Sequence, residues 1–408
     1  MKKLLISVIV IAISFSALAQ QYNKVTIGTI DSIQSTILKE QRKIWVYVPE
    51  SWPPGNKQRY PVLYLLDGEG HFYSVVGMIQ QLSQVNGNTV CPEMIVVGIT
   101  NTDRTRDLTP TKAAPNPPMI DSAMANGSGG GEAFVSFIEK ELMPHIDSLY
   151  PTQPYKMLVG HSLGGLTVMN VLMNHTKLFN SYIAIDPSMW WDKKNLLLAS
   201  KKKLIEMNFG GSNLYLGIAN TMEPGMNITK VKTDTSMMTE HIRAILDLDK
   251  TIKAQTKNGL SYASKYYGDD DHGSVPMIAT YDALHFFFKK YRFTISFKDF
   301  MDSAVDLAGK FEKHYQEVTK LLGYKVLPPE AMPSYIAYEA LKQKQFAKAE
   351  ALFKMNVKNY PDSPDANDAY GDYFVAIGNK EKAAEYFTKS LALKEDPERR
   401  KKLENVNK

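Results

Sequence analysis

The chain has 408 residues, of which 44% are hydrophobic and 22% charged, a composition typical of globular proteins that bury a large core. Its formal net charge is +5, and the basic residues are dispersed along the sequence, which argues against a protein that binds nucleic acid. The single cysteine, Cys91, excludes a disulfide within the chain. Because Cys91 lies at the edge of an apolar stretch, we interpret it as structural.

The first 19 residues have the pattern of an export signal. Lys2 and Lys3 form a basic start, residues 4–15 are apolar, and Ala-Leu-Ala at 17–19 forms a small-x-small cleavage site. The apolar stretch is short for a membrane span, although a retained anchor is the alternative interpretation. We therefore expect a bacterial protein that is periplasmic or secreted, with no membrane span in the mature chain.

Residues 20–292 alternate between predicted strands and helices. The expected strands are 24–30, 42–49, 60–66, 94–99, 156–160, 182–185, 214–218 and 262–267. The expected helices are 132–150, one that follows residue 162, 239–257 and 277–291, and a polar loop rich in proline and glycine covers 109–131. Several strands are continuous apolar runs, as in strands buried on both faces. This alternation predicts an α/β domain with a mostly parallel sheet and helices on both faces.

Residues 293–408 are predicted to be helical throughout and to form a small all-α domain. Ala337, Ala349 and Phe353 are matched 34 residues later by a small residue, an alanine and a phenylalanine. This spacing resembles two tetratricopeptide repeats over about 330–397. The alternative is plain helical sequence without repeat character.

Two repeats are fewer than the three usually needed for an independent fold. We therefore expect them to pack on a helix over 297–322 or on the α/β domain. The hypothesis for their role is that they bind a protein partner or adapt substrate access, and that they supply no catalytic group.

A serine between glycines ends one of the buried strands. Residues 156–165 read KMLVGHSLGG, so that Gly160, Ser162 and Gly164 form a G-x-S-x-G pattern between a strand and a helix. Such a serine lies on a sharp turn that holds its hydroxyl above the sheet, and residues without a bulky Cβ are needed beside it. The alternative is an ordinary strand–helix turn. We predict that Ser162 is a nucleophile and that His161 packs beside it or shapes the pocket.

A histidine follows the last predicted strand, where a general base is expected. His272 lies in the polar turn of YASKYYGDDDHGSVP, and this type of hydrolase uses the chain order serine, acid, histidine. His175 follows the helix after Ser162, and His241 and His285 lie within predicted helices. His272 is therefore the predicted base.

The identity of the acid that orients the base stays open, because several carboxylates are candidates. Asp234, in the segment that follows the strand at 214–218, is the preferred candidate. Glu223 in the same segment is the alternative. Asp186, which ends the preceding strand, and a dyad without a carboxylate are also considered.

Two backbone amides are needed to stabilise a developing oxyanion. One is expected from Leu163, directly after the serine. The other is expected from Glu69 in the loop DGEG, although that loop could be a simple turn.

These motifs together resemble the family of α/β-hydrolases known as Putative esterase. The segments RKIWVYVP, YPVLYLLDGEGHF, ELMPHIDSLYPT, LVGHSLGGL and DDDHGSVP occur in the order of that family, over about residues 24–292. The family includes feruloyl and acetylxylan esterases, siderophore-ester hydrolases, S-formylglutathione hydrolases and mycolyl transferases. The resemblance implies Ser162 as nucleophile, His272 as general base, and the amides of Leu163 and Glu69 as oxyanion donors, and it leaves the acid open.

We therefore expect a serine esterase that acts through an acyl-enzyme, as the resemblance implies, and that is exported, as the first 19 residues indicate. Alternatives are an acyltransferase that uses the same intermediate and a non-catalytic hydrolase-fold binding protein. The substrate is expected to be an acylated carbohydrate, a feruloyl ester or a siderophore. Trp190 and Trp191 follow a buried strand and could stack on it or belong to the core. Arg104 and Arg106 are interpreted as structural or rim residues, and no metal or cofactor is expected.

Overall fold

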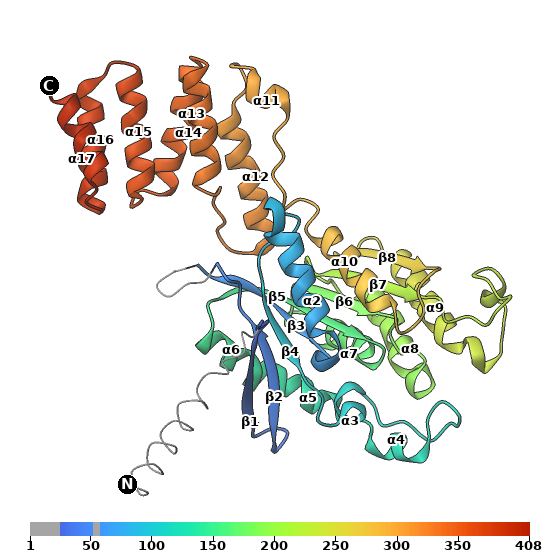
Figure 1. The fold of residues 1–408 in the computed structure, drawn as a ribbon. Helices are drawn as coiled ribbons and strands as arrows, with labels where there is room; N and C mark the ends of the chain where they lie inside the picture. The colour runs from blue at the N-terminus through green and yellow to red at the C-terminus, as the bar shows by residue number, and fades with distance from the viewer. Residues whose placement is uncertain (1–24, 52–57) are drawn as a thin grey trace, which may run out of the picture.

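The computed structural model describes residues 25–51 and 58–408 (Figure 1). The predicted export signal at residues 1–19 lies outside these ranges. Within them, no helix combines the length and the apolar character that a membrane crossing requires.

The centre of the molecule is an eight-stranded sheet with the strand order β1-β2-β4-β3-β5-β6-β7-β8. β1 and β2 are antiparallel, β2 is antiparallel to β4, and all other neighbours are parallel. The strands are β1 Thr29–Ser35, β2 Glu40–Tyr47, β3 Tyr60–Leu65, β4 Ile95–Ile99, β5 Thr152–His161, β6 Ser181–Ile185, β7 Asn213–Ala219 and β8 Ser261–Tyr267. The predicted α/β class with a mostly parallel sheet is confirmed.

The first strand differs from the sequence prediction. A strand was expected at 24–30, where apolar residues alternate, but β1 covers Thr29–Ser35. β1 is an edge strand that is mostly exposed, so polar residues occupy it and its sequence carries little hydrophobic periodicity.

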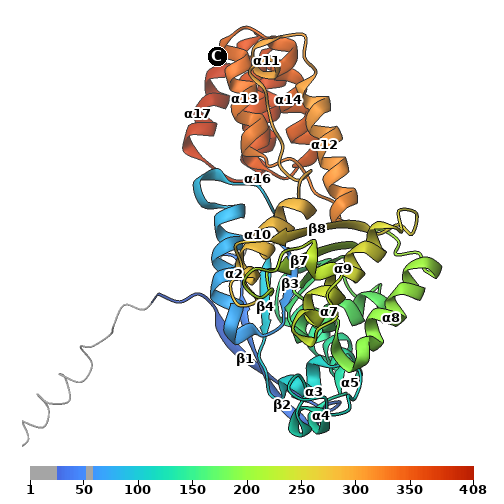
Figure 2. The ribbon, with the colours of Figure 1, turned by 90° about the vertical axis from the view of Figure 1, so that its right-hand side faces the viewer.

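Helices cover both faces of the sheet (Figures 1 and 2). Side chains alternate along β3, so that Tyr64 packs with the helices of one face and Leu65 with those of the other. α2 (Gly68–Ser83) and α10 (Val275–Phe287) cover the face of Leu65. The helices on the other side are α3 Arg104–Leu108, α5 Gly131–Phe137, a π-helical turn Ile138–Leu142, α6 Met143–Leu149, α7 Leu163–Asn174, α8 Trp191–Glu206 and α9 Glu240–Lys253.

The long loop predicted at 109–131 is packed against the domain. It contains the short helix α4 (Ser122–Gly127), and Ala113 and Ile120 are buried. The carbonyl oxygen of Thr111 accepts a hydrogen bond of 3.1 Å from Trp191 Nε1. The loop is therefore tied to the start of α8.

The C-terminal segment is all-helical, as predicted, and extends from one end of the α/β domain (Figures 1 and 2). Its helices are α11 Phe297–Met301, α12 Leu307–Leu322, α13 Ala331–Lys342, α14 Phe346–Asn359, α15 Pro364–Ala376, α16 Lys380–Leu393 and α17 Pro397–Val406. Val318 and Leu322 of α12 belong to the same apolar core as α2 and α10. Phe311, on the same helix, belongs instead to the core of the C-terminal helices. α12 therefore links the two parts.

The single helix expected over 297–322 is interrupted. α11 ends at Met301, and the Asp306 carboxylate caps a new helix by accepting the Gly309 N–H at 2.8 Å. The capping aspartate satisfies a first-turn amide, which favours a new start at this point. The tetratricopeptide character of the later helices remains a prediction.

Candidate active site

Ser162 lies on a strained turn between β5 and α7. Its backbone has φ 59° and ψ −116°, a conformation that is costly for a residue with a Cβ. A Cβ added at Gly160 would lie 2.4 Å from the carbonyl oxygen of Gly164, so glycine is required there. The Ser162 N–H donates to the Ile185 carbonyl at 3.0 Å, and its hydroxyl oxygen lies 3.4 Å from Ser188 Oγ. The turn has the geometry of a nucleophile elbow.

His272 lies in the turn between β8 and α10, as the sequence predicted. Its Nδ1 donates a hydrogen bond of 2.6 Å to Asp186 Oδ2. The side chain of His272 is 42% exposed, whereas that of Asp186 is completely buried. Since the carboxylate holds the proton on Nδ1, Nε2 is the ring nitrogen available to act as a base.

Asp186 directly follows β6 and carries a buried charge. Its Oδ1 accepts the Ala219 N–H at 3.0 Å, and its Oδ2 accepts from His272 and from His241 Nε2, the latter at 2.7 Å. Burial alone would raise the pKa of this carboxyl group. The hydrogen bonds from the two histidines outweigh burial and hold the pKa of Asp186 far below its usual range. Asp186 is therefore ionised at neutral pH.

The structure places Asp186 beside His272. Neither Asp234 nor Glu223 lies there. Asp234 accepts hydrogen bonds from Ser236 and Thr239, which lower its pKa. Glu223 is exposed. Within the described ranges, no hydrogen bond joins either of them to the histidine. The geometry therefore favours Asp186 over the preferred Asp234 as the partner of His272, and the signal in the sequence was a charged residue at the end of the buried strand YIAI.

Sequence reasoning set His241 aside as a helical residue, but the structure brings it to the site. It occupies the first turn of α9, and its ring lies 5.3 Å from the ring of His272. Asp186, His241 and His272 have ligand atoms within 4.8 Å of one another and are the described residues that could hold a metal ion. The same atoms are already joined by hydrogen bonds.

His161 directly precedes Ser162 and packs beside His272. Its ring centroid lies 4.3 Å from that of His272 and 6.0 Å from that of His71 on α2. Burial, together with the nearby His272 and His71, lowers the pKa of His161 to about 4. A neutral ring at this position can support His272 without repelling its protonated form.

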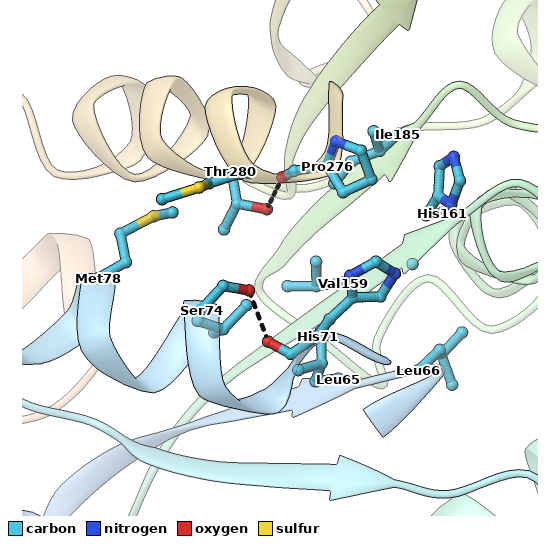
Figure 3. A pocket seen from close by; sticks show the side chains of 13 residues that line it. Leu65, Leu66, His71, Ser74, Met78, Val159, His161, Ile185, Pro276 and Thr280 are labelled. Carbon is cyan, nitrogen blue, oxygen red and sulfur yellow. Dashed lines mark hydrogen bonds between the residues drawn. The ribbon is translucent and has the colours of Figure 1, made fainter. Parts of the chain in front are cut away.

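A narrow pocket extends from these rings between α2 and α10 (Figure 3). His71 and His161 line one part of it, and Met78 and Thr280 line another. Its volume of about 10 Å³ has room for a single water molecule, so the pocket is too small for a substrate.

The predicted oxyanion donors lie in the first turns of two helices. Leu163 begins α7, and Glu69 lies in the first turn of α2, where backbone amides have no acceptor within the helix. The loop before α2 is firmly held: Asp67 accepts from Arg104 Nε at 2.6 Å, from Arg104 Nη2 at 3.0 Å and from Asn101 Nδ2 at 2.7 Å. Arg104 thus fixes Asp67, two residues before Glu69.

The two candidate tryptophans have different environments. Trp191 is 2% exposed, belongs to the core and donates its indole N–H to Thr111. For Trp191, burial favours the alternative that it belongs to the core. Trp190 is half-buried, with its ring 5.9 Å from that of Trp191, and stays a candidate.

Comparisons with known proteins show which proteins this chain is similar to. Residues 35–212 match the family described as Putative esterase. The chain is 33% identical over 171 residues to ferri-bacillibactin esterase BesA of Bacillus subtilis, covering 39% of this chain and 58% of that protein. It is 26% identical over 151 residues to the siderophore enterobactin esterase of Emericella nidulans, covering 34% and 50%. The chain thus spans about half the length of the curated relatives it matches.

Solved structures show the same fold. An IroE-like serine hydrolase from Shewanella oneidensis has a TM-score of 0.66 and 29% identity, covering 81% of this chain and 98% of that one. An uncharacterised protein from Capnocytophaga ochracea covers 93% of this chain and 99% of its own, with a TM-score of 0.64 and 18% identity, and shows the fold alone. The family match covers residues 35–212, and the relatives that match the chain are named as esterases, so this part of the chain is similar to the Putative esterase family of α/β-hydrolases.

Proposed function

We propose that the chain hydrolyses carboxylic esters through a triad of Ser162, Asp186 and His272. The observation that carries this proposal is the 2.6 Å hydrogen bond from His272 Nδ1 to a buried, ionised carboxylate beside the serine elbow. The three residues also follow the order serine, acid, histidine along the chain.

In the first half of the reaction, His272 Nε2 takes the proton from Ser162 Oγ as that oxygen attacks the ester carbonyl carbon. Asp186 balances the imidazolium that forms, and the amides of Leu163 and Glu69 donate to the negative oxygen of the tetrahedral intermediate. The intermediate then expels the alcohol, which takes its proton from His272. The products of this half are an acyl-enzyme on Ser162 and a free alcohol.

In the second half, water attacks the acyl carbon and gives its proton to His272. The second tetrahedral intermediate releases the carboxylic acid, and Ser162 Oγ recovers the proton. The contact between Ser162 Oγ and Ser188 Oγ is long at 3.4 Å, so little is lost when the hydroxyl turns toward His272.

Siderophore esters are the proposed substrate class. This proposal is supported by the relatives, which are named as esterases of ferri-bacillibactin, enterobactin and triacetylfusarinine C. Half-buried Trp190, close to the end of β6, offers an aromatic surface for a catecholate ring.

A panel of esters tests the proposed function. Purified protein would be incubated with catecholate trilactones, hydroxamate siderophore esters, feruloyl esters and acetylated carbohydrates, with Ser162→Ala as the control. We expect the highest kcat/KM on a siderophore ester and none in the control. Preferential turnover of feruloyl or acetyl esters would contradict the substrate class and leave the serine mechanism intact.

Export and the division at about residue 292 into a hydrolase domain and a helical domain are part of the same proposal. If residues 1–19 act as a signal, the mature protein outside the cytoplasm should begin at Gln20. Intact-mass measurement of protein from periplasmic and culture fractions tests this. A full-length mass in those fractions would contradict cleavage at this position.

A further inference from the structure

One oxygen of Asp186 accepts hydrogen bonds from two histidines. Oδ2 lies 2.6 Å from His272 Nδ1 and 2.7 Å from His241 Nε2. An ionised carboxylate has no proton to donate, so both rings present an N–H to it. The ring planes are nearly perpendicular, at 84°. The carboxylate is therefore held from two separate elements, the turn before α10 and the first turn of α9.

His241 is itself well fixed. Its side chain is only 15% exposed. The neighbouring Glu240 forms an ion pair with Lys194 at 3.2 Å, so this carboxylate is occupied elsewhere. The imidazole of His241 thus has one charged hydrogen-bond partner, Asp186, in the described structure.

The segment between β7 and α9 anchors the start of α9. Thr239 is buried, and its hydroxyl donates to Asp234 Oδ2 at 2.5 Å and accepts from Arg243 Nε at 2.9 Å. The hydroxyl of Ser236 also donates to Asp234 at 2.5 Å. These bonds hold the turn directly before His241. The carboxylate that the sequence suggested as the acid thus supports the element that carries His241.

The second histidine fixes the plane of the carboxylate. Besides the two rings, the described residues give the Asp186 carboxylate one further hydrogen bond, from the Ala219 N–H to Oδ1. Without His241, rotation of the carboxylate would be opposed only by that amide and by His272 itself. A buried carboxylate that loses a donor is also left with an unsatisfied charge.

We propose that His241 is a positioning residue that keeps Asp186 Oδ2 directed at His272 Nδ1. This inference rests on the proposed triad. An imidazole can donate its Nε2–H without adding a formal charge. The negative charge of Asp186 thereby remains available to balance the imidazolium that forms on His272 in each half-reaction.

Three substitutions separate the hydrogen bond from the bulk of the side chain. His241→Leu and His241→Met remove the N–H donor, and His241→Gln keeps an amide N–H at a similar reach. The control is His145→Leu, which removes a second His–Asp contact of 2.7 Å, to Asp31, on another part of the protein. All variants would first be compared by thermal unfolding to confirm that they fold.

The readouts are kcat, KM and the rate at which a fluorophosphonate labels Ser162, which reports the reactivity of the serine without an ester substrate. We expect His241→Leu and His241→Met to lower kcat and the labelling rate in parallel by about 10- to 100-fold, with little change in KM. His241→Gln should recover most of both rates. His145→Leu should match the wild type.

Unchanged kcat and labelling in a folded His241→Leu variant would overturn the inference. If that variant does not fold, equal rates in His241→Gln and His241→Met would overturn it instead. Ser162→Ala separates this failure from failure of the proposed function: hydrolysis by that variant would contradict the triad itself. An inactive Ser162→Ala with a fully active His241→Met would contradict only the role of His241.

Discussion

Asp186 and His272 are 86 residues apart in sequence, yet the carboxylate at the end of β6 meets the imidazole after β8 at 2.6 Å. β6 and β8 are separated by β7 in the sheet, so the contact forms at the edge where parallel strands end together. The proposed acid therefore reaches the proposed base directly from the end of its strand.

Asp186→Asn is expected to lower kcat by about 10³- to 10⁴-fold, because the amide neither holds the required tautomer of His272 nor balances its positive charge. Asp234→Asn, which only weakens the turn before α9, should lose far less activity. Steady-state kinetics on one ester, with circular dichroism to confirm folding, would compare the two. A larger loss in Asp234→Asn would return the acid role to that residue.

Stability should fall between about pH 6.5 and 4, because burial holds the pKa of His161 at about 4 in the folded protein. In this window the unfolded chain binds a proton at His161 that the folded chain does not, so acidification favours unfolding. The contribution is at most about 3 kcal/mol. His161→Phe should flatten the slope of unfolding free energy against pH in chemical denaturation. An identical slope in wild type and variant would contradict this assignment.

Arg104→Met is expected to lower kcat by about tenfold, since it frees Asp67 and loosens the start of α2, which carries the Glu69 amide. Arg106→Met is the matched control, because Arg106 contacts Glu40 and Asp107 instead. Both variants would be assayed for kcat and thermal stability. Equal kcat in the two variants would remove Arg104 from the support of the oxyanion site.

Truncation should separate the two parts of the chain at α12. A protein that ends at residue 327 keeps Val318 and Leu322 in the α/β core and should turn over a small acetyl ester at a rate close to that of the full chain. Ending at residue 292 uncovers that core and should lower the melting temperature or solubility. A folded 327-residue protein without activity on the small ester would show that the later helices complete the site.

Much of the fold followed from the sequence because buried parallel strands are continuous apolar runs. The strand at 60–66 was predicted within one residue of β3, and the strand at 262–267 within one residue of β8. The edge strand β1 was misplaced because one exposed strand with polar residues has no distinctive pattern. The break between α11 and α12 depends on a capping bond of Asp306 that periodicity does not reveal.

Part of the candidate site was also accessible from the sequence. Ser162 and His272 were identified from the elbow pattern and from their order along the chain, both of which are local. Asp186 and His241 come together only when β6, β8 and the start of α9 meet at one edge of the sheet. Burial of Trp191 likewise depends on the packed loop at 109–131, which the sequence marked only as polar.

The most direct test of the account is mass spectrometry of wild type and Ser162→Ala after treatment with a fluorophosphonate, combined with ester hydrolysis. We predict one covalent adduct on the peptide that contains Ser162, loss of hydrolysis as that adduct forms, and neither adduct nor hydrolysis in the folded variant. Hydrolysis by Ser162→Ala within tenfold of the wild-type rate, or an inactivating adduct on another residue, would contradict the proposed mechanism.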